Sequence, residues 1–385
     1  MEICDPTSME TEGCEYRTHQ KPRYLALTLI ILLILSLSSC TLLGKRMDRS
    51  GLESMAARIT EDFAPGSPEE LEAFLDRIDI EEATAVTEEA AATAAASTEG
   101  RPPDTWLLEG RLGSSLKERR YVFGEPFEEL IPEEVLERKA PARDAVFYRY
   151  ELEDTPSRGT VLFLPGLGVS DFAFRFIKHL FLTILEEGWD LVVYVPPFHL
   201  ERAGEGEDPE YTLFSDDIEA NIRYQLAMIR EVRTMVRVLE MEEAGPVGTW
   251  GGSMGAATLL ISSQWEDYDH AAVMIPIVDW NVVLTGNICM EKCVPAFREA
   301  GFDDELINRA YSLISPAEYA PGIKADRILV QAAKEDQLTP VSAVKEYAEN
   351  RGIDKVGIYR GSHASILLSC SVYKDYRSFL SSLSR

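Results

Sequence analysis

The stretch PVGTWGGSMGAATLLISS, residues 246–263, joins a run typical of a buried β-strand to a run typical of an α-helix. Between the two runs stands GGSMG, with Ser253 at its centre, which matches the pattern Gly-x-Ser-x-Gly. Residues without bulk beside the serine permit the strained strand-to-helix turn that lifts its hydroxyl clear of a sheet. An ordinary glycine-rich turn is the alternative, but the flanking runs favour Ser253 as a nucleophile.

Outward from this turn, short apolar runs alternate with long amphipathic segments. Runs predicted to be strands begin at Thr160, Leu191, Pro246, Ala271, Arg327 and Lys355. Segments predicted to be helices are 172–187, 216–241, 254–264, 340–350 and 366–383. This alternation predicts an α/β fold whose mostly parallel, twisted sheet is flanked by helices. Two earlier runs, at Tyr121 and Val146, fit an antiparallel edge.

One insert, residues 279–317, interrupts the alternation and predicts a small helical cap above the strand ends. Its apolar side chains either contact an apolar substrate or pack the cap internally. They are Val282, Val283, Leu284, Ile288, Met290, Val294 and Phe297.

A serine hydroxyl becomes a nucleophile when an imidazole takes its proton and a carboxylate fixes that imidazole. His363 is the histidine that lies between the last predicted strand and the last predicted helix. Asp336 follows the run RILVQAA, at a strand end that faces the same way as Ser253. The alternatives are a surface loop histidine and a carboxylate that caps a helix. We predict a Ser253–His363–Asp336 triad.

An oxyanion hole needs two backbone N–H donors. One follows the nucleophile, which makes it Met254, and the other belongs to the loop LPGLG at residues 164–168. Leu167 is the favoured donor in this loop, and Gly168 is the second choice.

Together FLPGLG, GGSMG, the Asp336 turn and the His363 loop resemble the α/β-hydrolase superfamily of esterases, lipases, thioesterases and peptidases. The resemblance covers about residues 145–383 and implies the α/β-hydrolase fold. In addition, PPFHLER looks like a Pro-x-His-x-x-Arg turn of some uncharacterised hydrolases. There His199 and Arg202 are candidates for the border of the substrate site. The alternative is a structural Arg202 that pairs with a carboxylate such as Asp217.

The first 40 residues look like a targeting segment. Arg17, Lys21 and Arg23 precede an apolar run of 14 residues, 24–37, which is short for a span of a ~30 Å hydrocarbon core. Leu37-Ser38-Ser39-Cys40 resembles the lipobox of bacterial lipoproteins. That resemblance implies cleavage before Cys40, acylation of this cysteine and a domain outside the cytoplasm. An uncleaved signal anchor is the alternative. Thr41 after the cysteine favours the outer membrane by resemblance to bacterial sorting rules.

Residues 41–105 are rich in Glu, Ala and Thr, with one amphipathic candidate helix at 67–78. Such a composition predicts a disordered or partly helical stalk. The predicted layout is therefore a signal peptide (1–40), a stalk (41–105) and a hydrolase domain (106–385) with its cap at about 279–317.

The charge of the chain is −27, which makes nucleic acid an unsuitable partner and leaves any membrane attachment to a hydrophobic anchor. No sequence motif implies a cofactor or a metal site. Cys289 and Cys293 stand four residues apart, a spacing at which a helix brings two cysteines near each other.

The sequence thus predicts a serine hydrolase that cleaves a carboxylic ester, of a small molecule, a lipid or an acylated envelope component, through an acyl-enzyme. Two alternatives stay open. One is a peptidase or amidase with the same triad, and the other is a catalytically silent surface interaction protein.

Overall fold

The computed structural model describes residues 41–61, 65–97, 116–124, 144–153, 155–168, 171–202, 216–286 and 288–383. The predicted signal segment and Cys40 lie outside these residues. Within them, no helix is both long and apolar enough to cross a membrane.

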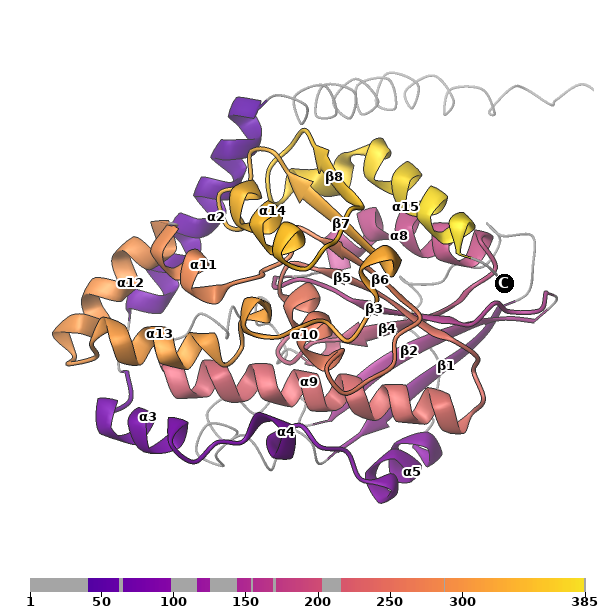
Figure 1. Cartoon of the computed structure of the whole chain (residues 1–385), viewed down its shortest axis with the longest axis horizontal. Coiled ribbons are helices and arrows are strands. Elements are labelled where there is room, and N and C mark those ends of the chain that lie inside the picture. Colours follow the sequence, from indigo (N-terminus) through magenta and orange to yellow (C-terminus); the bar gives the residue numbers. More distant parts are fainter. Residues whose placement is uncertain are drawn as a thin grey trace, which may run out of the picture.

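A single eight-stranded sheet runs through the described part of the chain (Figure 1). Its strand order is β1-β2-β4-β3-β5-β6-β7-β8. β1 and β2 pair antiparallel, β2 also pairs antiparallel with β4, and the remaining pairs are parallel. The predicted mostly parallel sheet and its antiparallel edge are therefore confirmed. The strands are β1 (Leu116–Phe123), β2 (Ala145–Leu152), β3 (Thr160–Leu164), β4 (Asp190–Val195), β5 (Val247–Gly252), β6 (His270–Met274), β7 (Ile328–Ala333) and β8 (Val356–Tyr359).

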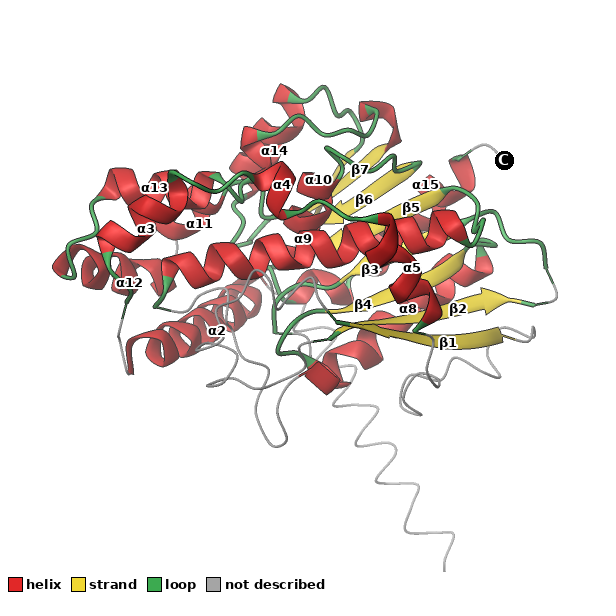
Figure 2. Cartoon of the chain, turned by 90° about the horizontal axis from the view of Figure 1, so that it is seen from below, coloured by secondary structure: helices red, strands yellow, loops and turns green. Residues whose placement is uncertain are grey.

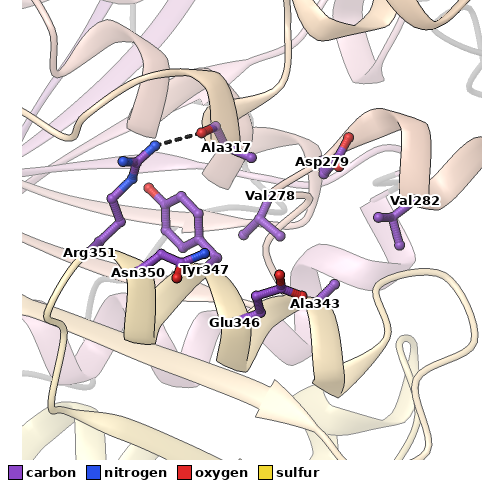
Figure 3. A pocket seen from close by; sticks show the side chains of 9 residues that line it. All are labelled: Val278, Asp279, Val282, Ala317, Ala343, Glu346, Tyr347, Asn350 and Arg351. Atoms are coloured by element: carbon purple, nitrogen blue, oxygen red, sulfur yellow. Dashed lines mark hydrogen bonds between the residues drawn. The ribbon is translucent and has the colours of Figure 1, made fainter.

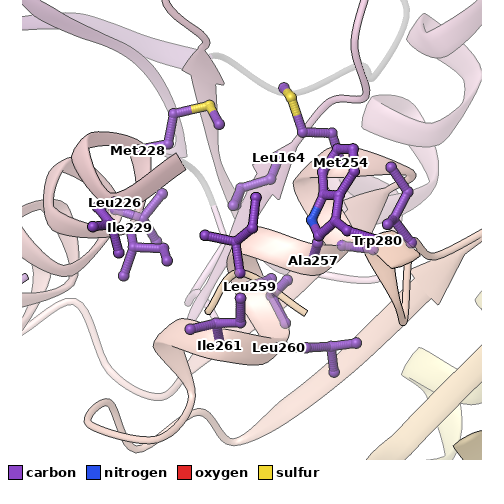
Figure 4. Close-up of a cluster of buried hydrophobic side chains, with 14 of the residues drawn as sticks. Leu164, Leu226, Met228, Ile229, Met254, Ala257, Leu259, Leu260, Ile261 and Trp280 are labelled. Atoms are coloured by element: carbon purple, nitrogen blue, oxygen red, sulfur yellow. The ribbon is translucent and has the colours of Figure 1, made fainter. Parts of the chain in front are cut away.

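Helices cover both faces of the sheet, which explains why its central strands are continuously apolar. Successive residues of a strand point to opposite faces. In β3, Leu162 and Leu164 join the core under α9 (Ile218–Met241), α10 (Met254–Ser262) and α14 (Val341–Asn350). Val161 and Phe163 join the core under α8 (Asp171–Glu186) and α15 (Cys370–Ser382). Figure 4 shows the first core where α9 and α10 meet.

The insert between β6 and β7 is helical, as predicted. It contains α11 (Trp280–Gly286), α12 (Ile288–Glu299) and α13 (Asp304–Ser312), followed by the short helices η4 (Pro316–Glu318) and η5 (Ala325–Arg327). Val283, Leu284 and Phe297 are buried in the core, and Val294 packs against it. These side chains favour the packed cap over a substrate-binding surface. Cys293 is also buried, and the side chain of Cys289 lies outside the described part.

The segment before β1 is partly helical and packs against the rest of the described chain. Its described residues form α2 (Thr41–Glu61), α3 (Pro68–Leu75), α4 (Ile80–Ala83) and α5 (Glu88–Ala96). Figure 2 shows α3, α4 and α5 along α9, and α2 contacts α12 at the end of the sheet that carries the cap. The predicted helix at 67–78 is confirmed by α3, whose N-cap Ser67 accepts a hydrogen bond from the amide of Glu70 at 3.2 Å.

One small apolar surface and one pair of hydrogen bonds explain why this segment docks. Ala91 and Ala94 lie one turn apart on α5 and are both buried, so the helix approaches α9 and β1 closely. Arg233 of α9 donates to the carbonyl and the hydroxyl of Thr84, at 2.8 and 2.9 Å. Composition alone therefore underestimates the order of this segment, because its partner surface lies far away in the sequence.

Candidate active site

Ser253 stands on a strained turn between β5 and α10. Its backbone has φ 52° and ψ −114°, a region that costs a non-glycine residue about 1–3 kcal/mol. The two outer glycines of the motif allow the turn. A Cβ on Gly255 would lie 2.3 Å from the carbonyl oxygen of Leu164, and one on Gly251 would lie 2.7 Å from the Cα of Ala256. The glycines of the Gly-x-Ser-x-Gly pattern are therefore required because a side chain at either position would clash with the neighbouring backbone.

The predicted base meets the predicted nucleophile. His363 lies in the loop after β8, and its Nε2 is 2.9 Å from the hydroxyl oxygen of Ser253. In the neutral imidazole the proton is on Nδ1, which faces Asp336, so Nε2 is an acceptor. The Ser253 hydroxyl therefore donates to Nε2. The described part of the chain thus brings together two residues that are 110 positions apart.

Asp336, the predicted acid, is hydrogen-bonded to His363. Oδ2 of Asp336, in the loop after β7, lies 2.9 Å from Nδ1 of His363, which donates its proton to this oxygen. Oδ1 accepts the amides of Leu338 and Thr339 at 2.8 and 2.7 Å. The hydroxyl of Thr339 donates to Oδ2 at 2.8 Å. The carboxylate therefore has one orientation. It does not cap α14, whose N-cap residue is Pro340 and has no side-chain cap bond, but it orders the loop before that helix.

The surroundings of His363 favour its charged form. Burial is the largest single influence and opposes the charge, but the carboxylate of Asp336 and then that of Asp48 outweigh it, so the pKa of His363 is raised above its ordinary value of 6.5. A base whose conjugate acid is stabilised in this way accepts a proton from serine more readily.

The loop after β3 lies directly over the nucleophile. A Cβ on Gly166 would be 3.0 Å from the Cβ of Ser253, so only a glycine fits against it without displacement. Met254 is the first residue of α10, where an amide has no acceptor in its own helix. The amide of Gly168 donates to Nε2 of His199 at 2.8 Å and is thereby engaged. Of the two predicted loop donors, Leu167 is the one that this geometry favours.

His199 supports that loop from behind. Its Nδ1 lies 2.7 Å from the carbonyl oxygen of Pro197, so Nδ1 carries the proton while Nε2 accepts from Gly168. Burial lowers the pKa of His199 to about 4, which keeps the ring neutral and able to accept. The side chain is buried, so its contacts are structural.

Arg202 lies in the core and pairs with a different acid from the one considered in the sequence. In η2 (Leu200–Arg202), its Nη1 and Nη2 each lie 2.9 Å from a carboxylate oxygen of Glu231 on α9, and both side chains are fully buried. Tyr194 of β4 donates to the same carboxylate at 2.6 Å. Asp217 instead caps α9 by accepting from the amide of Ala220 at 3.0 Å. The alternative of a structural Arg202 paired with a carboxylate is therefore confirmed with Glu231 as the carboxylate, which lies opposite Arg202 only after α9 packs on the sheet.

Two contributors to the site carry no sequence motif. Thr339 holds the acid through its hydroxyl, and Asp48 of α2 accepts the backbone amide of His363 at 2.9 Å. Thr339 stands three residues after Asp336, a spacing that suits such a bond, whereas nothing in the sequence connects residue 48 with residue 363.

A cavity of about 460 Å³ opens where the cap joins the sheet (Figure 3). Val278, Asp279 and Val282 line it where the chain enters the cap. Glu346 and Tyr347 of α14 line it from the other side, together with Arg351, the residue after that helix. Arg351 donates to the carbonyl oxygen of Ala317 at 2.5 Å and so ties α14 to the end of the cap. No cluster of three or more His, Cys, Asp or Glu side chains suited to a metal ion occurs in the residues that the structure describes.

Comparison with known proteins gives relatives in structure alone. No protein-family model matches the sequence, and no curated protein resembles it in sequence. Among solved structures, acetyl xylan esterase 1 from a Thermoanaerobacterium species is 13% identical with a TM-score of 0.52, over 83% of this chain and 95% of that one. An esterase from Pyrococcus furiosus is 16% identical with a TM-score of 0.47, over 73% and 97%.

A third similar structure is an acylaminoacyl peptidase from Pyrococcus horikoshii, 14% identical with a TM-score of 0.47, over 72% of this chain and 43% of that one. At 13% identity, the likeness to the Thermoanaerobacterium esterase shows a shared fold and no shared substrate. The strand order and the likeness to the Thermoanaerobacterium esterase together show that this chain has the α/β-hydrolase fold.

Proposed function

We propose that the protein is a serine hydrolase that cleaves a carboxylic ester. The observation that carries the proposal is the hydrogen-bonded row from Ser253 through His363 to Asp336, with 2.9 Å at each step. In the first step the Ser253 oxygen attacks the ester carbonyl carbon while its proton passes to Nε2 of His363. The amides of Leu167 and Met254 are the proposed donors to the oxyanion.

The tetrahedral intermediate then collapses. The bond from carbon to the leaving oxygen breaks, His363 returns its proton to that oxygen, and an acyl group stays on Ser253. In the second half, a water molecule gives its proton to His363 and attacks the acyl carbonyl. The bond to the serine oxygen breaks, and Ser253 recovers its proton from His363. Asp336 holds the imidazole throughout and stabilises its positive charge.

We infer the substrate class from the net charge of the chain and from its proposed location in the cell envelope. A chain of charge −27 repels polyanions, so a neutral ester suits it better than a phosphorylated one. We propose a small-molecule or lipid ester, or an acylated component of the cell envelope. Amide cleavage by the same residues is the competing activity, and loss of activity despite an intact triad is the remaining alternative.

The experiment is turnover of p-nitrophenyl esters from acetyl to palmitoyl, with matched p-nitroanilides, by the wild type and Ser253→Ala. Ester turnover that is lost in the variant supports the proposal, and the preferred chain length separates an esterase from a lipase. Faster turnover of the anilides would support an amidase. No turnover of either series would favour a catalytically silent protein.

We also propose that the protein is lipid-anchored at Cys40, in the bacterial outer membrane rather than the inner one, with its domain outside the cytoplasm. Thr41, the residue after Cys40, is the first described residue and belongs to α2. A Cβ on Gly44, within the first turn of α2, would lie 3.2 Å from the Cβ of Ser362, beside His363. An acyl chain on Cys40 would be attached four residues before Gly44 in the sequence. We propose that it holds the part of the domain around the start of the described α2 residues close to the bilayer.

Metabolic labelling with an alkyne palmitate tests this proposal. The wild type is expected to take up the label and to fractionate with membranes, while Cys40→Ser loses both properties and Cys370→Ser keeps them. Cys370 is an exposed cysteine far along the chain and serves as the matched control. Equal labelling of the Cys40→Ser variant and the wild type would contradict the anchor.

A further inference from the structure

Asp48 of α2 reaches both loops that carry the catalytic acid and base. Its Oδ2 accepts the amide of His363 at 2.9 Å and lies 3.4 Å from the amide of Gln337, and its Oδ1 accepts the amide of Ala364 at 3.2 Å. Gln337 is the residue after Asp336. One carboxylate therefore ties the loop after β7 to the loop after β8.

The helix that carries Asp48 is seated closely on the same loops. Gly44, one turn before Asp48, lies against Ser362 and Ser365, because a Cβ there would approach Ser362 Cβ to 3.2 Å and Ser365 Oγ to 3.4 Å. Lys45 pairs with Glu335 at 2.8 Å, next to the catalytic acid. These contacts fix the depth and the rotation of α2, so that the Asp48 side chain points at the backbone of His363.

Asp48 is buried, unlike most acidic residues on a protein surface. The residue is 6% exposed, and burying a carboxylate is costly unless hydrogen bonds and a nearby positive charge compensate. Backbone amides supply the hydrogen bonds. A protonated His363 supplies the positive charge, and this charge exists only when the base has taken a proton.

We propose that Asp48 is a positioning residue of the catalytic site, which holds the His363 loop and stabilises the imidazolium that forms during the reaction. The proposal rests on the hydrolase function proposed above. It makes α2 part of the working site, although the sequence of this helix suggested a tether.

Charged groups around the imidazole come from two parts of the chain, the loop after β7 and α2. Asp336 approaches from the loop after β7, Asp48 approaches from α2, and the Lys45–Glu335 pair lies beside them. Ser253 and Thr339 add uncharged hydroxyls, with Thr339 Oγ1 3.4 Å from Nδ1. The negative charge of Asp48 is among the influences that raise the pKa of His363.

The test compares full-length wild type with three variants of α2. Asp48→Asn removes the charge and one acceptor, Asp48→Glu keeps the charge, and Glu53→Gln removes the same charge from an exposed position where Glu53 pairs with Arg49. Two quantities are measured for each protein. They are the pH profile of kcat/KM on p-nitrophenyl acetate and the pKa of His363 from the NMR titration of its Cε1–H signal, assigned with His363→Gln.

Asp48→Asn is expected to lower the pKa of His363 by roughly half a unit to one unit and to move the acidic limb of the profile equally. It should also reduce kcat roughly tenfold, because the imidazole is held less firmly. Asp48→Glu should keep the limb in place, and Glu53→Gln should match the wild type. A merely structural aspartate would lower the melting temperature without moving the limb or the pKa, and that result would overturn the proposal.

Two readouts keep this test separate from the hydrolase proposal. The NMR pKa of His363 does not require activity, so it decides the role of Asp48 even in an inactive protein. In the wild type itself, the amides of His363 and Ala364 are expected to be protected from hydrogen exchange. Rapid exchange of both amides in a folded wild type would overturn the proposal. This measurement uses the wild type alone, so it decides the question even if Asp48→Asn fails to fold.

Discussion

The two carboxylate oxygens of Asp336 have different hydrogen-bond partners. Oδ1 accepts backbone amides, and Oδ2 holds the imidazole together with the Thr339 hydroxyl. In Asp336→Asn one oxygen becomes an amide nitrogen, and the imidazole is expected to turn to the wrong tautomer. We predict a fall in kcat of about 10⁴-fold with an unchanged melting temperature.

The control for this change is Asp354→Asn. Asp354 is exposed and precedes β8, at the opposite end of the strand from His363, so its neutralisation should leave kcat within about twofold of the wild type. Steady-state kinetics on p-nitrophenyl acetate measures both variants. An Asp336→Asn enzyme that keeps a tenth of the wild-type kcat would contradict the assigned acid.

The raised pKa of His363 gives a second prediction at the scale of the residue. The base works only when neutral, so activity falls as the pH drops through the pKa of the imidazole. Since that pKa is raised from 6.5, the acidic limb of kcat/KM is expected above pH 6.5. A pH profile at constant ionic strength measures it. A limb well below pH 6.5 would show that the surrounding carboxylates do not outweigh burial.

At the scale of the element, the buried Arg202–Glu231 pair joins η2 to α9. Removing one partner of a fully buried pair leaves an uncompensated charge and costs about 3–5 kcal/mol. We predict this loss for Glu231→Gln in urea unfolding. Glu240→Gln breaks the exposed pair between Arg237 and Glu240 on the same helix and should cost at most about 1 kcal/mol. Equal unfolding midpoints for the two variants would contradict the structural role of the buried pair.

The helix α5 offers a matched pair of alanines that tests whether the segment before β1 docks. Ala94 is fully buried, and Ala92 is exposed on the same helix. A glutamate at position 94 must be accommodated in a packed interface, which costs about 1–3 kcal/mol or more, while one at position 92 reaches solvent. We expect Ala94→Glu to lower the free energy of unfolding and Ala92→Glu to leave it almost unchanged. Identical curves would favour the stalk that composition suggested.

At the scale of the whole molecule, the sequence predicted what depends on local pattern. The strands and helices of the sheet follow from apolar runs and their spacing, and the turn at Ser253 follows from glycines whose hydrogen atoms face Leu164 and Ala256. Asp336 and His363 could be chosen because parallel strands end at one edge of a sheet, which brings their following loops together.

What the sequence did not predict depends on packing between distant segments. The sequence contains several acidic residues that could pair with Arg202, and Glu231 is brought to it by the packing of α9 on the sheet. Asp48 lies in a segment of low hydrophobicity that is stabilised by its contacts with α12 and the catalytic loops. A composition argument treats such a segment as isolated, so it does not include the partner surface that orders it.

The central claim is that Ser253 is the nucleophile of a serine hydrolase. The most direct measurement is reaction of the folded protein with a fluorophosphonate, followed by mass mapping of the modified peptide. The account predicts one adduct, on Ser253, that disappears in Ser253→Ala and persists in Ser378→Ala, where an exposed serine of α15 is removed. A folded wild type that stays unmodified, or that reacts at another serine, would contradict the account.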